Sequence, residues 1–166
     1  MLSQTACSAI RFQPVVIHFS PASKARGDSQ MQLHATSISF EDAGLLILGP
    51  SGTGKSTLAL QLMAAGALLV ADDRTDLHRE GPAIMASCPP PLLGRIEARG
   101  IGILAADPAR PVRIVQVVDL GAGCAGRLPQ SQSLDVLGIA LPLVTTPYRP
   151  HLYAALRQLV LNGRIA

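Results

Sequence analysis

The chain has 166 residues, of which 48% are hydrophobic, 15% charged and only 3% aromatic. This length suits one domain, and the hydrophobic content excludes a chain that is disordered throughout, so we expect one folded unit with an aliphatic core. The formal net charge is +3, but the first 30 residues carry +2 of it, which leaves the remainder nearly neutral. Because clustered positive charge and aromatic stacking platforms are both missing, we expect no nucleic-acid partner.

Cysteine spacing and hydrophobic run length exclude further classes. Cys7, Cys88 and Cys124 are odd in number and widely spaced, so neither a disulfide framework nor a zinc site is indicated. No uninterrupted apolar run approaches the ~18 residues of a membrane-spanning helix, because Gly66 and Pro142 interrupt the longest ones. We therefore expect a cytoplasmic protein with no membrane partner.

Residues 1–30 mix serine, proline and basic residues without sustained hydrophobic periodicity. The apolar piece at 15–19 is too short and too interrupted for a secretory signal. We therefore exclude residues 1–30 from the fold, either as a disordered tail or as sequence upstream of a true start at Met31. The folded domain is assigned to residues 31–166.

Strand and helix patterns alternate from Met31 onward. Alternation through Ser39 predicts a strand, and the apolar run 44–49 predicts a buried strand that ends in glycine. Leucines on one face predict a helix over 56–65, with Gly66 as its stop. The other expected elements are strands at 67–71, 75–78, 83–86, 100–104, 112–120 and 139–144, an extended Cys88–Pro91 segment, a loop over 121–132 and a closing helix over 150–161. This order predicts an α/β domain.

A phosphate-loop motif stands between the second predicted strand and the first predicted helix. The segment Gly49-Pro-Ser-Gly-Thr-Gly-Lys-Ser56 has the pattern of glycine, four residues, glycine, lysine and serine or threonine. Backbone N–H groups at 52–54 can surround a polyphosphate, Lys55 can reach the terminal phosphates, and the Ser56 hydroxyl can hold magnesium. The alternative is a glycine-rich turn without a ligand. The predicted nucleotide-binding residues are Gly49, Pro50, Ser51, Gly52, Thr53, Gly54, Lys55 and Ser56.

Two adjacent carboxylates, Asp72 and Asp73, follow the predicted strand at 67–71. Open parallel sheets place ligand chemistry at this end of their strands. One carboxylate can hold magnesium near the phosphates while the other serves as a base toward a substrate hydroxyl. The alternative is a solvated acidic turn that includes Arg74.

Three more polar residues are candidates for the same site. Glu97 and Arg99 are two apart, which places them on one face of a strand, and Gly100 follows them. The alternative for this acid and arginine is a surface ion pair. A lone histidine such as His34, on a predicted strand, is more often a half-buried structural residue than a catalyst.

In combination these motifs resemble the C-terminal catalytic domain of HPr kinase/phosphorylase, the enzyme that phosphorylates a serine of the phosphocarrier protein HPr. The matching blocks, in family order, are His34, Gly49–Ser56, Val70–Asp73, Ile96–Ile103 and, more weakly, Pro147–Pro150. The resemblance covers about residues 31–163 and implies a P-loop domain with a mixed sheet and flanking helices. It also implies ATP and Mg²⁺ as cofactors, an HPr-like carrier as partner and a homo-oligomer, a hexamer, as the assembly.

Residue roles follow from the same resemblance. The implied catalytic residues are His34, Lys55, Asp73 and Arg127. Ser56 and Glu97 would contact magnesium, and Asp73 would take the proton from the attacking serine and return it in the reverse phosphorolysis. The supporting residues would be Asp72, Arg99, Gly100 and Arg149.

The chain departs from the family pattern in several places. The family's N-terminal domain is not expected here, because the first 30 residues leave no room for one. Thr57 stands where the family usually has a glutamate, and no Gly-Arg follows Arg149-Pro150, in a region linked to dephosphorylation. We therefore expect serine kinase activity that regulates a phosphotransferase system, with phosphorolysis left open. A small-metabolite kinase and a non-catalytic nucleotide sensor are the alternatives.

Overall fold

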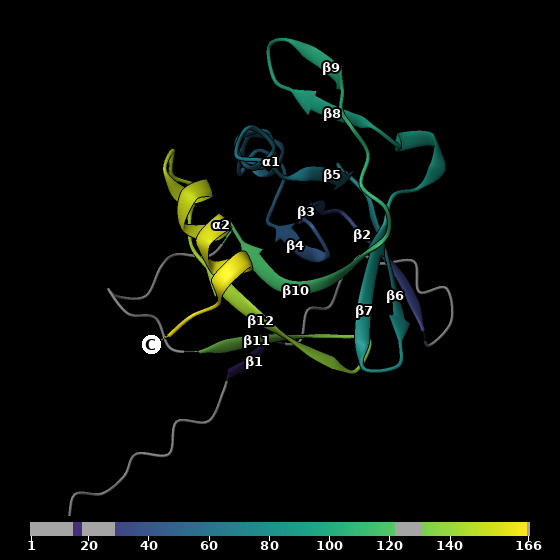
Figure 1. Ribbon diagram of the computed structural model, residues 1–166, viewed down its shortest axis with the longest axis vertical. Coiled ribbons are helices and arrows are strands. Elements are labelled where there is room, and N and C mark those ends of the chain that lie inside the picture. Colours follow the sequence, from purple (N-terminus) through teal and green to yellow (C-terminus); the bar gives the residue numbers. More distant parts are fainter. Residues whose placement is uncertain (1–14, 18–28, 122–130, 166) are drawn as a thin grey trace, which may run out of the picture.

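The computed structural model describes residues 15–17, 29–121 and 131–165. Ten of the described strands form one mixed sheet, and β8 and β9 form a separate hairpin. The strands are β1 (Val15–Ile17), β2 (Gln30–Leu33), β3 (Thr36–Phe40), β4 (Ala43–Leu48), β5 (Leu68–Ala71), β6 (Thr75–Glu80), β7 (Ala83–Ser87), β8 (Arg95–Ala98), β9 (Gly102–Ala105), β10 (Val112–Asp119), β11 (Gln132–Val136) and β12 (Ile139–Thr145). The helices are α1 (Lys55–Ala64) and α2 (Leu152–Asn162), with a short 3-10 helix at Pro90–Leu92. Figure 1 shows a curled sheet with the β8–β9 hairpin projecting beyond it.

The sheet order places two loop-forming strand ends at one edge. The main strand order is β1-β11-β12-β10-β4-β3-β5. Off this path, β7 pairs with β10, β6 pairs with β7 and β2 pairs with β6. Strand β3 pairs antiparallel with both β4 and β5, so β4 and β5 run in the same direction on either side of it. The carboxyl ends of β4 and β5 therefore meet at the same edge, as in other α/β folds that bind ligands there.

Strand alternation builds a hydrophobic core on each face of the sheet. In β4, Leu45 and Ile47 pack in the cluster that includes α1 and α2, whereas Leu46 and Leu48 pack in the cluster on the opposite face. Successive side chains of a strand point to opposite faces, so this fully apolar strand is buried on both sides. A rigid, doubly covered β4 thus holds the start of the phosphate loop in place.

The expected α/β class with a mixed sheet and flanking helices is confirmed, and three local predictions are wrong. The strand expected from Met31 through Ser39 is two strands, because β2 pairs with β6 whereas β3 pairs with β4 and β5. The extended Cys88–Pro91 segment runs into the 3-10 helix at Pro90–Leu92, which proline dihedral angles permit. β11 was not expected. It joins β12 through a two-residue turn in which Leu137 and Gly138 both have positive φ.

The segment excluded from the fold contributes two described pieces. β1 pairs in parallel with β11, and β2 begins at Gln30. No described helix is both long enough and apolar enough to cross a membrane.

Candidate active site

The phosphate loop occupies the turn between the end of β4 and the start of α1. Gly49 and Gly54 have φ angles of 137° and 96°, which are left-handed conformations that glycine adopts without strain. A Cβ at Gly54 would lie 3.1 Å from the ring of Tyr148, so the ring packs directly on the loop backbone. The loop is fixed further by the Thr53 hydroxyl, which donates to the Pro50 carbonyl at 2.9 Å.

Lys55, the first residue of α1, holds its ammonium inside this loop. The side chain is 7% exposed, and Nζ donates to the carbonyls of Gly49 at 2.8 Å and Pro50 at 3.2 Å. Burial lowers the pKa of Lys55, while the negative charges of Asp72 and Asp73 act in the opposite direction. The site therefore places a cation where the motif predicts the terminal phosphates.

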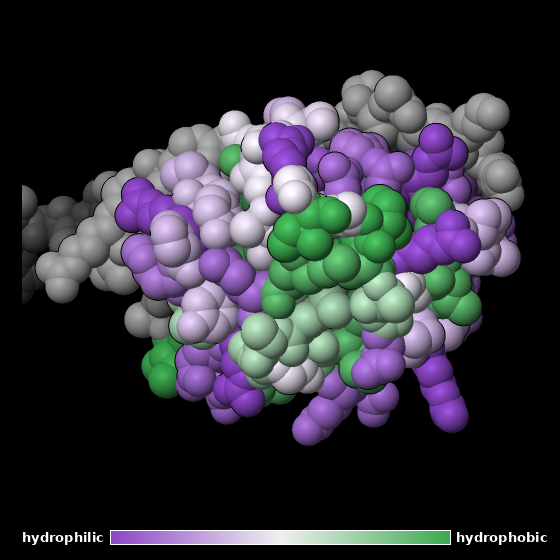
Figure 2. All heavy atoms as spheres, turned by 90° about the horizontal axis from the view of Figure 1, so that it is seen from above, coloured by the Kyte–Doolittle hydropathy of each residue, from purple (hydrophilic) through white to green (hydrophobic). Residues whose placement is uncertain are grey.

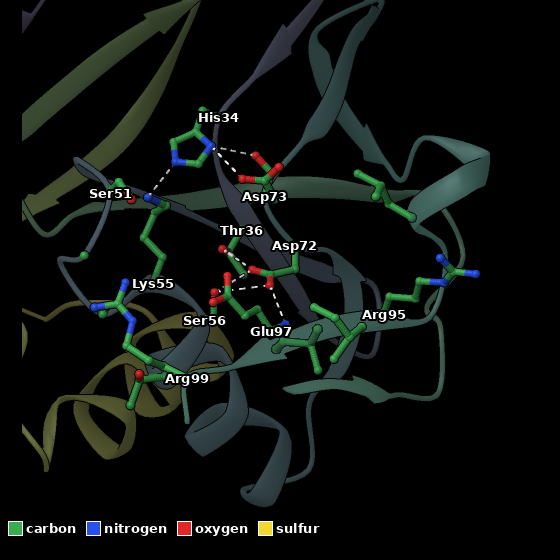
Figure 3. Close-up of a pocket in the computed structure, with 16 residues that line it drawn as sticks. His34, Thr36, Ser51, Lys55, Ser56, Asp72, Asp73, Arg95, Glu97 and Arg99 are labelled. Carbon is green, nitrogen blue, oxygen red and sulfur yellow. Dashed lines mark hydrogen bonds and ion pairs between the residues drawn. The ribbon is translucent and has the colours of Figure 1, made fainter. Parts of the chain in front are cut away.

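Asp72 lies at the centre of a buried hydrogen-bond network. Its carboxylate accepts bonds from the hydroxyl of Thr36 at 2.7 Å, the hydroxyl of Ser56 at 2.9 Å and the backbone N–H of Glu97 at 3.0 Å. Figure 3 shows Asp72 surrounded by these three residues. One 6%-exposed carboxylate thus joins β3, α1, the end of β5 and β8. A magnesium-binding hydroxyl next to a strand-end aspartate is the arrangement of phosphate-loop nucleotide hydrolases.

Asp73 points away from that network and toward His34. His34 Nδ1 lies 3.0 Å from Asp73 Oδ1 and 2.9 Å from the Asp73 carbonyl, while Nε2 lies 3.2 Å from Lys55 Nζ. The tautomer with its hydrogen on Nδ1 fits these three contacts, because Nδ1 then donates to the oxygens of Asp73 and Nε2 accepts from the Lys55 ammonium. The Asp73 carboxylate is 60% exposed and also lies 3.8 Å from Arg74 Nε. The alternative of a solvated acidic turn therefore describes only Asp73, not buried Asp72.

The β8–β9 hairpin forms the opposite wall. Glu97 lies in β8 and pairs across the ribbon with Ile103 of β9. The prediction that Arg99 shares a strand with Glu97 is wrong, because β8 ends at Ala98 and a turn follows. No ion pair among the described residues joins these two side chains, so the surface-pair alternative is wrong as well.

These walls enclose a cavity of about 390 Å³. Its lining contains ten of the predicted site residues, which are His34, Ser51, Gly52, Gly54, Lys55, Ser56, Asp72, Asp73, Glu97 and Arg99. Five other predicted site residues are not part of the lining, and they are Gly49, Pro50, Thr53 and the exposed Gly100 and Arg149. Arg127 lies outside the described residues.

Several lining residues were not among the predicted site residues. They are Thr36, Thr57, Leu92, Arg95, Ile96 and Ile103. Thr36 carried a usable signal, because a hydroxyl in a strand buried on both faces needs an acceptor, and the acceptor is Asp72. Ile96 and Ile103 lie within the family block quoted from the sequence, whereas Leu92 carried no signal, because it lies outside every motif and reaches the cavity from the 3-10 helix.

The oxygen groups of the cavity fit a magnesium nucleotide. The described acids, histidines and cysteines form no cluster of three or more that could hold a metal by itself. Ser56, Asp72 and Glu97 instead offer a few hard oxygen groups beside the phosphate loop. Magnesium is usually bound by one or two carboxylates together with substrate phosphates, so this sparse set suits it.

Comparison with known proteins places these features in a family. The sequence profile described as HPr Serine kinase C-terminal domain matches residues 28–112, about half of the chain. HPr kinase/phosphorylase of Ralstonia pickettii is 39% identical over a stretch that covers 69% of this chain and 39% of that protein. The Burkholderia lata protein of the same name is 40% identical, with 68% of this chain and 39% of that protein covered.

A solved structure agrees with the sequence relatives. The HPr(Ser) kinase/phosphatase of Coxiella burnetii superposes with a TM-score of 0.68 at 28% identity, covering 81% of this chain and 90% of that chain. The chain spans 39% of the length of these curated relatives. The profile match, the relatives and the shared architecture lead to one conclusion: the chain belongs to the family of HPr serine kinase C-terminal domains.

Proposed function

We propose that the chain is an ATP- and Mg²⁺-dependent protein serine kinase that acts on an HPr-like phosphocarrier and so regulates a phosphotransferase system. One observation carries the proposal. A buried Lys55 ammonium and an exposed Asp73 carboxylate line the same cavity, bridged by the His34 ring. This pairs a group for anionic phosphates with a base for a hydroxyl, which are the two requirements of phosphoryl transfer to serine.

On the donor side, the loop backbone and Lys55 would bind the phosphates of ATP. Ser56 and Glu97 would hold magnesium, which supplies neutralisation of phosphate charge when bound. Asp72 would keep the Ser56 hydroxyl in place, because that hydroxyl already donates to its carboxylate. Arg99, which also lines the cavity, would add positive charge near the transferred group.

On the acceptor side, Asp73 would take the proton of the attacking serine hydroxyl. Its exposure leaves room for a protein substrate, and His34 Nδ1 fixes the orientation of the carboxylate. In the reverse phosphorolysis, which we also propose, the same carboxyl would return that proton. Arg127 is our proposed third cationic group for the transferred phosphoryl.

Transfer of labelled γ-phosphate from Mg-ATP to an HPr-type carrier from the same source tests the proposal. We expect label on the wild-type carrier, none on a carrier Ser→Ala variant and none with Lys55→Ala. Asp73→Asn should bind nucleotide normally and transfer no phosphate, because it removes the base but not the loop. Nucleotide binding without labelled carrier would instead support the sensor alternative, and label on a small metabolite would support a metabolite kinase.

Two parts of the proposal concern the reverse reaction and the assembly. In the proposed phosphorolysis, inorganic phosphate added to the phosphorylated carrier should release pyrophosphate despite the altered segment after Arg149, and no release would restrict the activity to the kinase direction. Light scattering should give the mass of a homo-oligomer, a hexamer by family resemblance. We also propose a cytoplasmic location, because the proposed reaction would use ATP as its phosphate donor.

A further inference from the structure

The β8–β9 hairpin exposes apolar side chains that the catalytic chemistry does not use. Ile101 at its turn is 78% exposed and Ile103 in β9 is 66% exposed, and all four residues of β9 are exposed. Among the described strands, β9 pairs only with β8, so its outer edge is free. Figure 2 looks onto the side from which the hairpin projects and shows hydrophobic side chains gathered in one exposed area. Such areas mark interaction sites.

The strand register shows that this apolar edge is continuous with the active site. Cross-strand partners share a face, so Ile103 shares its face with Glu97, and Leu104 shares the other face with Ile96. Ile96 is buried and β8 contacts α1, so that face belongs to the core. Ile103 therefore stands beside Glu97 at the cavity, whose lining includes both.

We propose that the hairpin lip, defined as Ile101 and Ile103, is the docking surface for the acceptor protein and binds apolar side chains next to its phosphorylated serine. The inference rests on the proposed kinase function. A small acceptor would occupy the cavity and leave Ile101, which is not part of the lining, in water. A protein whose serine reaches Asp73 would cover the cavity that Ile103 also lines, and its apolar side chains would remove both isoleucines from water.

A second copy of the chain is the less favoured occupant. Ile103 lines the cavity itself, so a permanent contact there would cover the entrance that the acceptor needs. The charges around the lip also fit a separate partner. Arg95 and Arg99 are exposed on the same hairpin, and neither takes part in an ion pair among the described residues. An acceptor surface with an apolar centre and acidic residues at its edge would complement this arrangement.

Ile101→Ser in the full chain tests the proposal with the phosphocarrier as substrate. We expect KM for the carrier to rise about tenfold, because an anchoring side chain of this size is lost from the interface. Nucleotide affinity and kcat at saturating carrier should stay within about twofold of the wild type. The contacts that Ile101 makes with the carrier would stabilise the bound substrate and the transition state equally, so their loss raises KM alone. A short peptide in which glycines replace the residues that flank the carrier serine should be phosphorylated equally by both proteins, because it carries no apolar side chain for the lip to bind.

Ile165→Ser is the matched control, since Ile165 is fully exposed and lies outside the cavity lining. An Ile101→Ser protein with the KM of the wild type and of this control would overturn the docking surface while leaving the kinase proposal intact. A change of oligomer mass in Ile101→Ser alone, with unchanged KM, would assign the lip to self-association and also overturn it. If the wild type phosphorylates neither carrier nor peptide, the kinase proposal fails first and the docking surface fails with it.

Discussion

The two adjacent aspartates provide the sharpest test of how burial divides the roles within this site. Asp72 accepts bonds from the Thr36 and Ser56 hydroxyls and the Glu97 N–H, whereas Asp73 is 60% exposed and contacts His34 and Arg74. Replacing each by asparagine changes one oxygen to an NH₂ group and removes the charge. The identical change at neighbouring positions should have very different effects on stability.

The magnitudes follow from the partners. In Asp72→Asn, an NH₂ group must face either the Glu97 N–H, which cannot rotate, or the two hydroxyls, so at least one buried donor loses its acceptor. That loss should lower the free energy of unfolding by about 2 kcal/mol. In Asp73→Asn only exposed pairs are lost, which should cost about 0.5 kcal/mol or less. The positive φ of 67° at Asp73 adds no strain, because asparagine also adopts this conformation.

Urea unfolding followed by circular dichroism, with the m value checked for constancy, measures both differences. Asp72→Asn should also weaken nucleotide binding through the Ser56 hydroxyl, whereas Asp73→Asn should not. Equal destabilisation of the two variants, or a neutral Asp72→Asn, would refute the assignment of Asp72 as the buried structural partner.

Three further predictions concern the loop glycine, the loop lysine and a cysteine. Gly54→Ala should lower the free energy of unfolding by about 1–2 kcal/mol and abolish nucleotide binding, because the φ of Gly54 is positive and a Cβ there would meet Tyr148. Gly66→Ala controls for backbone strain, because Gly66 has a φ of 99° and open space around it, and this variant should bind nucleotide normally. Burial lowers the pKa of Lys55 from 10.5, so the ammonium loses its proton at a lower pH than an exposed lysine does. Nucleotide affinity measured by calorimetry should therefore fall below pH 10.5. A constant affinity up to pH 10.5 would contradict this. Burial raises the pKa of the Cys88 thiol, and the negative charges of Asp76 and Asp72 raise it further. At pH 8, iodoacetamide should therefore modify Cys88 more slowly than the cysteine of an unstructured peptide. Faster modification of Cys88, measured by peptide mass spectrometry, would disprove this.

The features that sequence predicted well are those encoded by local pattern. The phosphate loop can be predicted from the sequence because its glycines, lysine and serine stand close together between a buried strand and a helix. The break between β2 and β3 was missed, since continuous alternation gives no sign that the two halves pair with different strands. β11 was missed because Gln132–Val136 is short and half polar, and only its pairing with β12 and β1 makes it a strand.

The division between Asp72 and Asp73 shows the same limit within the site. The sequence presents two equivalent carboxylates, and the family resemblance alone separates their roles. In the folded chain the difference arises from strand geometry, because consecutive residues at a strand end point in opposite directions. Asp72 continues the inward direction at the end of β5 and meets Thr36 of neighbouring β3, while Asp73, with its left-handed backbone, turns toward His34.

In the proposed phosphoryl transfer, this geometry would let one strand end serve both substrates. Asp72 is held by three donors and positions the hydroxyl on the donor side, so it needs burial to stay fixed. In the proposed role, Asp73 would meet a hydroxyl that arrives on another protein, and its 60% exposure leaves it accessible for that. Only one backbone step separates the two carboxylates, and the distance between the donor and acceptor sides is therefore set by covalent geometry rather than by side-chain packing. An inserted residue between them would move Asp73 out of its contact with His34, and such a variant should keep nucleotide binding but lose transfer to serine.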